Sequence, residues 1–462
     1  MEPSNQDTTA QRLVEFAQNL QYEDLPDEAI YCAKARILST LAVSLAAYDF
    51  PPVQIAEKVV PDVAAGPRAR ILGSLKGTSP EMAAFVNSAM VRCLDMSDTA
   101  VMAAVSHPAD AFPAILAIAE AENLSGKELL LAMAIIYEAQ VRFVEVVPYN
   151  HHGWDQTPVV AMGAALGTAR LMGLDEEKMH HALSLAITPN LALNQTRTGK
   201  LSMWKGMAGP QGARQGVFAA QLAREGMTGP EGVFEGKFGL WNQMMNGEQY
   251  DLPIPKTFKD HIFAVQQTVV KAFPIRFNCH LPVFCAIEMR DKVNLDDVKT
   301  FKIESIRQAF DRWMDLPEIW KPETRESADH SLPCTVALGL LDGGITPATH
   351  TKERYKDQDV LELMSKMELE LPDEFADLAF ETRCCRITAT LKNGESVTVE
   401  KRLTQADDVN GPSREEVEGK FNRLTEPLIS PANRQQILDT VWALETAKNV
   451  ENLIDLTRLT ET

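Results

Sequence analysis

Basic residues are scarce in this sequence relative to acidic ones. Its 462 residues include 45 Lys and Arg against 64 Asp and Glu, which gives a formal net charge of −19. A chain with this excess of negative charge is repelled by phosphate backbones, so nucleic acid is excluded as an expected partner. The hydrophobic fraction of 45% and the charged fraction of 24% are typical of a globular protein, and the length predicts two or three domains.

Cysteine is also sparse, and its spacing disfavours two kinds of site. The seven cysteines include no CxxC pair. An odd number of scattered cysteines in a long chain indicates free thiols rather than a disulfide framework. An iron–sulfur cluster needs clustered thiolates, so we expect none.

Long apolar runs are lacking as well. No segment approaches the run of about 18 apolar residues that a membrane helix needs. The first residues, MEPSNQDTTAQ, contain neither the basic nor the apolar region of a secretory signal. We therefore expect a cytoplasmic protein that does not associate with membranes.

From about residue 10 to residue 245 the spacing of apolar residues is typical of helices almost throughout. Apolar residues recur at helical spacing from Ile30 to Leu45, and Ser125 to Glu128 reads as a capping box. The Ala- and Gly-rich segment from Val159 to Leu171 permits close helix packing. These features predict a compact all-α body.

The character of the sequence changes after the Pro-rich stretch 252–255. We expect a helix from Leu281 to Val293 and a half-buried strand from Val298 to Ile306. Asn393-Gly394 between two alternating runs is a strong signal for a β-hairpin. Beyond Ser413 the pattern is helical again.

These patterns predict a mainly α fold with an α+β second domain. We expect a large all-helical domain built from both chain ends, residues 1–268 and 409–462, with the α+β domain at residues 269–408 inserted between them.

The first candidate functional segment runs from Leu94 to Asp110 and contains Asp95, Thr99 and His107. A carboxylate and an imidazole on one loop can share proton transfer, because burial or a neighbour tunes each toward neutral pH. In the alternative interpretation Asp98 and Asp110 cap helices and His107 is a surface loop residue.

The second segment is His151 to Thr157. Adjacent histidines seldom point at one ion, and no second His cluster lies at ligand spacing, so we expect no metal. Thr157-Pro158 indicates a helix start, which places Asp155 beside a helix N-terminus. Such a terminus stabilises an anion, either this carboxylate or that of a substrate.

A basic loop follows at residues 194–209. It carries Arg197, Lys200 and Lys205, which are unexpected in so acidic a chain and suit a cradle for carboxylates. The alternative is an exposed loop that balances nearby acids, and the spacing matches no Walker pattern.

The last segments belong to the second region. They place Lys271, Arg276, His280, His330 and Cys334 beside apolar anchors. Asp329-His330 alone is weak evidence for a site, because such pairs are common.

Taken together, these segments resemble the MmgE/PrpD family, which includes 2-methylcitrate dehydratases and cis-aconitate decarboxylases. The resemblance covers nearly the whole chain, in the same order. It rests on Leu94-Asp95, Asp98-Thr99, His107-Pro108-x-Asp110, Gly153-Trp154-Asp155, Arg197-Thr198-Gly199, Trp204-Lys205-Gly206, Arg214 to Ala220, Lys271-x-Phe273-Pro274 with His280, and Thr324-Arg325-Glu326 leading to Ala328 to Pro333.

The resemblance implies a helical domain with an inserted lid, a homodimer, and an active site between the two domains that needs no metal or cofactor. Matching the motifs gives four catalytic residues: Asp95, His107, Lys205 and Lys271. We expect the substrate-binding residues to be Thr99, Asp155, Arg197, Lys200, Arg276, His280, His330 and Cys334.

Several positions depart from the family pattern. Cys334 stands where the lid usually has Tyr, and Gln156 stands where dehydratases often have His. Decarboxylases tend to have His at the position of Asp155, and Ala111 replaces an Asn.

Family chemistry agrees with these charges. Eliminating water from a tricarboxylate builds negative charge on a carboxylate, and fixed cations lower that barrier. We expect a cofactor-independent hydro-lyase acting on a di- or tricarboxylate such as 2-methylcitrate, in which Asp95 or His107 acts as base or acid while Lys205 and Lys271 hold carboxylates. The alternatives are a cis-aconitate-type decarboxylase, an epimerase or isomerase of a small dicarboxylate, and a non-catalytic binding protein.

Overall fold

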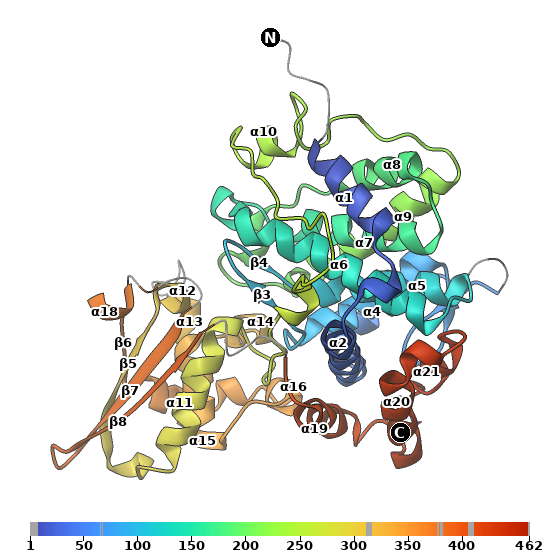
Figure 1. Cartoon of the computed structure of the whole chain (residues 1–462). Helices are drawn as coiled ribbons and strands as arrows, with labels where there is room; N and C mark the ends of the chain where they lie inside the picture. Colours follow the sequence, from blue (N-terminus) through green and yellow to red (C-terminus); the bar gives the residue numbers. More distant parts are fainter. Residues whose placement is uncertain are drawn as a thin grey trace.

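The first half of the chain is helical (Figure 1). The computed structural model describes residues 8–64, 66, 68–310, 317–376, 378, 382–404 and 411–460. Short paired strands interrupt the helices: β1 (Ala69–Arg70) with β2 (Gly77–Thr78), and β3 (Ala100–Val101) with β4 (Val105–Ser106). The helices of this half are α1 (Thr8–Asn19), α2 (Asp27–Ala47), α3 (Pro51–Val59), α4 (Pro80–Cys93), α5 (Phe112–Ala121), α6 (Gly126–Val146), α7 (Thr157–Leu171), α8 (Glu176–Ile187), α9 (Ala208–Arg224) and α10 (Leu240–Met244).

Local sequence explains the helices that carry the site. The predicted capping box at the start of α6 is confirmed, because Ser125 Oγ accepts from the Glu128 N–H and Glu128 accepts from the Ser125 N–H. Helices α7 and α9 pack closely because both are rich in small residues. A Cβ added at Gly216 of α9 would lie 2.4 Å from Ala164 Cβ of α7. Nearer the starts of both helices, which adjoin the candidate segments, a Cβ added at Gly212 would lie 2.5 Å from the Thr157 carbonyl oxygen.

A four-stranded sheet dominates the second region, with strand order β6-β5-β7-β8. The predicted hairpin at Asn393-Gly394 is confirmed: β7 and β8 pair antiparallel, and Gly394 has a φ of 91°. The predicted strand from Val298 is confirmed as β5, which pairs parallel with β6 and antiparallel with β7. The strands are β5 (Val298–Ser305), β6 (Met367–Glu370), β7 (Arg383–Leu391) and β8 (Ser396–Leu403).

Helix α11 packs on this sheet and on α15. It spans His280–Arg290, so it ends three residues before the predicted end at Val293. The remaining helices are α12 (Arg307–Phe310), α13 (Pro317–Trp320), α14 (Arg325–Ala328), α15 (Leu332–Asp342), α16 (Pro347–Thr351), α17 (Gln358–Met364), α18 (Asp373–Ala376), α19 (Arg414–Thr425), α20 (Pro431–Trp442) and α21 (Glu451–Asp455).

The buried apolar residues form two large clusters. One contains residues from Ala10 to Val265 together with Val417 to Leu456, and the other runs from Ile275 to Val399. Helix α19 packs against α2, so the C-terminal helices share the core of the first half (Figure 1). The chain is thus mainly helical with a smaller β component. The domain bounds stay a prediction, and the predicted boundary at residue 408 lies outside the described residues.

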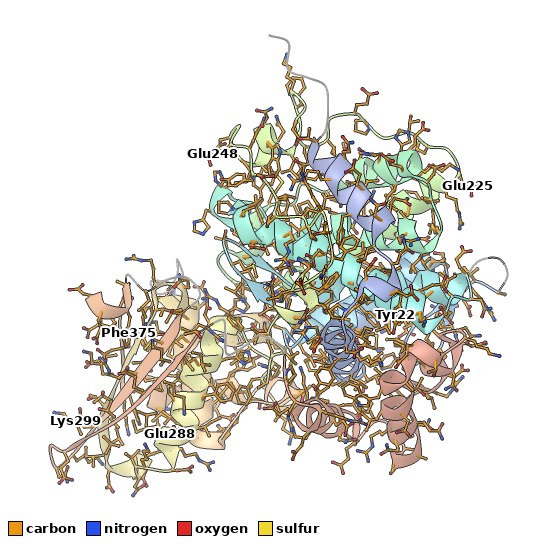
Figure 2. The ribbon with its side chains drawn as sticks, viewed as in Figure 1. Tyr22, Glu225, Glu248, Glu288, Lys299 and Phe375 are labelled. Atoms are coloured by element: carbon orange, nitrogen blue, oxygen red, sulfur yellow. The ribbon has the colours of Figure 1, made fainter. Side chains whose placement is uncertain are left out.

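Helix α2 is long and apolar enough to cross a membrane by length and composition alone. However, 83% of its apolar window is buried inside the protein, and its buried residues include Arg36 and Ser39. Acidic side chains such as Glu225 and Glu248 are exposed and project outward (Figure 2). All seven cysteines are free and buried, which confirms the prediction of free thiols.

Candidate active site

Asp95 lies in the turn that ends α4, and its backbone has a φ of 50°. This left-handed conformation is strained for a residue with a Cβ, by roughly 1 kcal/mol or more. The side chain is 2% exposed. Strain at a buried charged residue points to a functional constraint rather than to packing.

Three cations surround this carboxylate. Arg92 Nη1 lies 2.7 Å and Lys271 Nζ lies 2.6 Å from Asp95 Oδ1, and Lys205 Nζ lies 3.1 Å from Oδ2. Burial alone would raise the pKa of Asp95, but the three cations outweigh it and hold the pKa well below its usual range. Asp95 is therefore an anion that orders two lysines.

Lys205 and Asp329 form the second pair of the cluster. Lys205 lies in the short helix Met203–Gly206 just before α9, and its Nζ donates to both oxygens of Asp329 at 2.7 and 2.8 Å. His330 Nδ1 lies 2.6 Å from the same carboxylate. Burial, reinforced by Lys205, lowers the pKa of His330 to about 4, so its imidazole is neutral at pH 7.

Lys271 reaches the cluster from the segment before α11. Its Nζ donates to Asp95 Oδ1, to the Asp95 carbonyl at 3.0 Å and to the Ile275 carbonyl at 3.2 Å. Burial lowers the pKa of Lys271, and Asp95 opposes that effect. The ammonium is therefore held by fixed acceptors rather than by water.

His107 has the geometry of a base. Its Nδ1 lies 3.2 Å from the Asp98 carbonyl, which only accepts, so Nδ1 carries the proton and Nε2 is left as an acceptor. Burial, together with Arg92 and Lys271, holds the pKa of His107 well below its usual range. The imidazole is neutral and 6% exposed.

Asp110 is a candidate acid beside His107. Gln156 contacts both residues, because its Oε1 accepts from the backbone N–H of His107 at 3.2 Å and its Nε2 donates to Asp110 Oδ2 at 3.0 Å. Burial raises the pKa of Asp110 to about 7, and Arg92 opposes that rise. A carboxyl with this pKa can hold a proton at neutral pH and release it.

Asp155 joins the basic loop to the start of α7. Its Oδ1 accepts from Arg197 Nη2 at 3.1 Å and from the Gln156 N–H at 2.7 Å. Arg197 also donates to the Lys205 carbonyl at 3.1 Å. Asp155 Oδ2 is buried and has no hydrogen-bond partner among the described residues.

Two more predicted residues lie close to the cluster. Thr99 pairs with Val269 through both backbone groups, which joins the segments that carry Asp95 and Lys271. His280 begins α11, and burial with help from Lys271 lowers its pKa to about 3. His280 Nε2 is a second buried atom for which the described part of the chain offers no partner.

The structure does not bring three predicted residues into the cluster. The Lys200 side chain is 57% exposed and pairs with Glu323 at the surface, as the alternative interpretation of the loop expected. Arg276 contacts the cluster through its backbone, whose N–H donates to the Asp329 carbonyl, while its side chain donates to Gln308. Cys334 is fully buried in the core of the second region, and burial raises its pKa to about 12.

Sequence reasoning missed three residues of the site. Arg92 lies three positions before Asp95 on the last turn of α4, where a basic residue usually faces solvent. Asp329 was visible only as half of a common Asp-His pair. Arg325 donates to the Cys93 carbonyl and pairs with Glu326 at 2.6 Å, which connects α14 to the end of α4.

One group of side chains has the composition of a metal site. Ligand atoms of Asp95, Asp329 and His330 all lie within 4.8 Å of one another. The Lys205 ammonium already lies between both carboxylates, so a divalent cation there would face a positive charge at contact distance. The arrangement is that of an ion-pair network.

Two protein-family models match the chain, and both describe the MmgE/PrpD family. The model of the MmgE/PrpD N-terminal domain matches residues 11–253, and that of the MmgE/PrpD C-terminal domain matches residues 273–444. A cis-aconitate decarboxylase of Mus musculus is 27% identical over 399 residues, which cover 82% of the chain and 78% of the relative.

Two further relatives are named 2-methylcitrate dehydratase. A 2-methylcitrate dehydratase of Salmonella typhi is 26% identical over 363 residues, covering 74% of the chain and 72% of the relative. Another from Cupriavidus necator is 25% identical over 453 residues, covering 90% of both. Identity at this level is similar for the two activities and does not favour either.

Proposed function

Because the chain belongs to the MmgE/PrpD family, we propose that it is a cofactor-independent lyase of small polycarboxylates, and specifically a hydro-lyase acting on a tricarboxylate such as 2-methylcitrate. The observation that carries this proposal is the concentration of cations in an acidic protein. Arg92, Lys205 and Lys271 are buried around one carboxylate, although the net charge is −19. Surface charge is screened within about 8 Å at physiological salt, so this local field governs an anionic ligand.

The first step is removal of a proton next to a substrate carboxylate. His107 suits this role better than Asp95, because its Nε2 is a free acceptor while Asp95 is engaged by three cations. Negative charge then develops on the adjacent carboxylate, and Lys205 and Lys271 stabilise it through their positive charge, because their ammonium N–H groups already donate to protein acceptors.

The second step is loss of the hydroxyl group, which needs a proton. Asp110, with a pKa near 7, supplies it, and Gln156 keeps this carboxyl next to His107. An acid and a base whose positions depend on one amide, the acid through its carboxyl and the base through its backbone, are suited to an elimination in which one proton leaves carbon and another reaches oxygen.

A decarboxylase is the second candidate, and Asp110 favours it as well. Loss of CO₂ leaves a carbanion that must be protonated, and a buried acid with a pKa near 7 is a suitable donor. The same cations would bind the remaining carboxylates.

The test is to incubate the purified protein separately with 2-methylcitrate, citrate and cis-aconitate. A hydro-lyase forms a new alkene from a hydroxy acid, which mass spectrometry detects as loss of water, whereas a decarboxylase releases CO₂ from cis-aconitate. Racemisation of an added dicarboxylate would indicate an epimerase. Binding heat without turnover of any acid would overturn the lyase proposal in favour of a binding protein.

Two further properties belong to this proposal. Activity is expected to survive extended treatment with EDTA, because lysines neutralise the acidic cluster. Inactivation that one particular metal reverses would contradict this expectation.

We also propose that the protein is a cytoplasmic homodimer. The exposed apolar side chains of Leu193, Met203 and Trp204 favour the dimer. Sedimentation of the purified protein tests it.

A further inference from the structure

Lys420 is a buried cation with an unusual set of partners. It lies on α19 in the C-terminal segment and is 4% exposed. Its Nζ donates to Ser39 Oγ at 2.9 Å, to the Met96 carbonyl at 3.0 Å and to the Lys271 carbonyl at 2.8 Å. Within the described part of the chain it makes no ion pair.

Packing alone does not explain a charge at this position. Burying a cation without a contacting anion costs more than burying an apolar side chain of the same size. The cost is visible in Lys420, because burial lowers its pKa to about 7 even though Asp98 opposes that shift. An apolar residue would join α19 to α2 more cheaply.

The two carbonyls belong to the segments that hold the central ion pair of the site. Met96 directly follows Asp95, whose backbone is in the left-handed conformation, and Lys271 is the partner of Asp95 itself. These segments are 176 residues apart in the sequence. The three N–H groups of one ammonium thus fix both segments relative to α2.

We propose that Lys420 is a positioning residue that holds the backbone of Asp95 and the backbone of Lys271 in register for catalysis. The Thr99–Val269 backbone pair still joins the two segments when Lys420 is removed. Loss of Lys420 therefore shifts the alignment of the ion pair without separating the segments.

Lys34 provides a matched control. It is also a buried lysine, and it ties α2 to the C-terminal helices through the Trp442 carbonyl at 2.9 Å and Glu445 at 2.5 Å. Among the described residues, Lys34 makes no hydrogen bond or ion pair with the Asp95 or Lys271 segments. Ser39→Ala is a second control, because it removes the contact of Lys420 with α2 and keeps the two carbonyl contacts.

The experiment compares Lys420→Met, Lys34→Met and Ser39→Ala by melting temperature, kcat and KM. The kinetic comparison rests on the proposed function, which supplies the substrate. We expect Lys420→Met to lower kcat by about tenfold or more and to change KM by less than about threefold, while both controls keep kcat within about twofold. Lys420→Gln, which keeps N–H donors, is expected to restore part of kcat. Equal kcat losses in Lys420→Met and Lys34→Met would overturn the proposal.

A second measurement separates this proposal from the proposed function. Crystal structures of the wild type, Lys420→Met and Lys34→Met report the distance between Lys271 Nζ and Asp95 Oδ1, whatever the substrate is. We expect the 2.6 Å contact to be lost only in Lys420→Met. An unchanged contact would overturn the proposal even if turnover is observed. If Lys420→Met does not fold, Lys420→Gln is measured instead, and we then expect an intermediate loss of kcat and a longer contact; wild-type values of both would overturn the proposal.

Discussion

Two ion networks in this protein are near mirror images in charge. Around Asp95, one carboxylate lies among three cations and every member is buried. Around Arg354, one guanidinium pairs with three carboxylates, Asp342, Asp357 and Asp359, at 2.6 to 3.1 Å, and those carboxylates are 31 to 56% exposed.

The distances are similar, but the environments differ. In water an ion pair contributes little, because solvent screens the charges and the side chains lose freedom. In the interior each charge depends on its partner, since an unpaired buried charge is costly. Removing one charge should therefore cost more in the buried network than in the network around Arg354.

Lys205→Met is expected to have the largest effect. It leaves Asp95 and Asp329 without their shared cation, so we expect a loss of roughly 3 to 5 kcal/mol of folding free energy and a fall in kcat of at least about tenfold. Denaturant titration and steady-state kinetics measure the two effects.

The double variant Lys205→Met with Asp329→Asn serves as the control. It removes the stranded charge, so stability should recover while activity does not. Recovery of both would show that Lys205 acts only through the fold.

Asp110→Asn should change how the stability of the protein depends on pH, because Asp110 is a buried carboxyl beside the Asp95 network. The folded pKa of Asp110 is about 7 against 3.8 in the unfolded chain, so folding favours the protonated form, and this group makes the protein less stable as pH rises from 3.8 to 7. The full difference corresponds to on the order of 4 kcal/mol. The variant should therefore gain stability relative to the wild type between about pH 4 and pH 7 in thermal melts. A difference that is independent of pH would contradict the assignment.

Cys334→Tyr changes a position in the buried apolar core of the second region, and so compares that core with the two ion networks. Cys334 is fully enclosed on α15, so a phenol ring overpacks the core and should cost about 1 to 3 kcal/mol. If the position instead lines the substrate pocket, as the family pattern implies, the variant keeps its stability and loses the longer of two tricarboxylates first. Melting temperature together with kcat/KM on both acids decides between the two.

Arg354→Gln should have the smallest effect. Its partners are hydrated, so we expect a change within about 1 kcal/mol that shrinks further at high salt, and no change in kcat. A loss as large as that of Lys205→Met would remove the distinction between the two networks.

Sequence reasoning predicted the elements whose signals are local. The Asn393-Gly394 hairpin and the capping box at Ser125 depend on neighbouring residues, and both are confirmed. The motifs also selected Asp95, Lys205 and Lys271, and the structure places both ammonium groups within 3.1 Å of the Asp95 carboxylate, although their catalytic roles stay predictions.

The residues that were missed depend on long-range packing. Lys200 and Lys205 lie on the same loop, yet one is exposed and the other is 2% exposed, because the loop turns inward just before α9. Nothing near Arg92, Asp329 or Lys420 in the sequence distinguishes them from ordinary surface charges. Asp329 and Lys420 are buried against segments more than 100 residues away.

The contact of α19 with α2 has a consequence for biosynthesis. A ribosome releases the chain from its N-terminus, so every predicted catalytic residue emerges before Arg414, where α19 begins. Until α19 arrives, α2 lacks one of its packing partners, and the Met96 and Lys271 carbonyls lack the ammonium that joins them. Assembly of the site therefore has to wait for the synthesis of α19, and a chain interrupted before Arg414 would carry the predicted catalytic residues without this alignment.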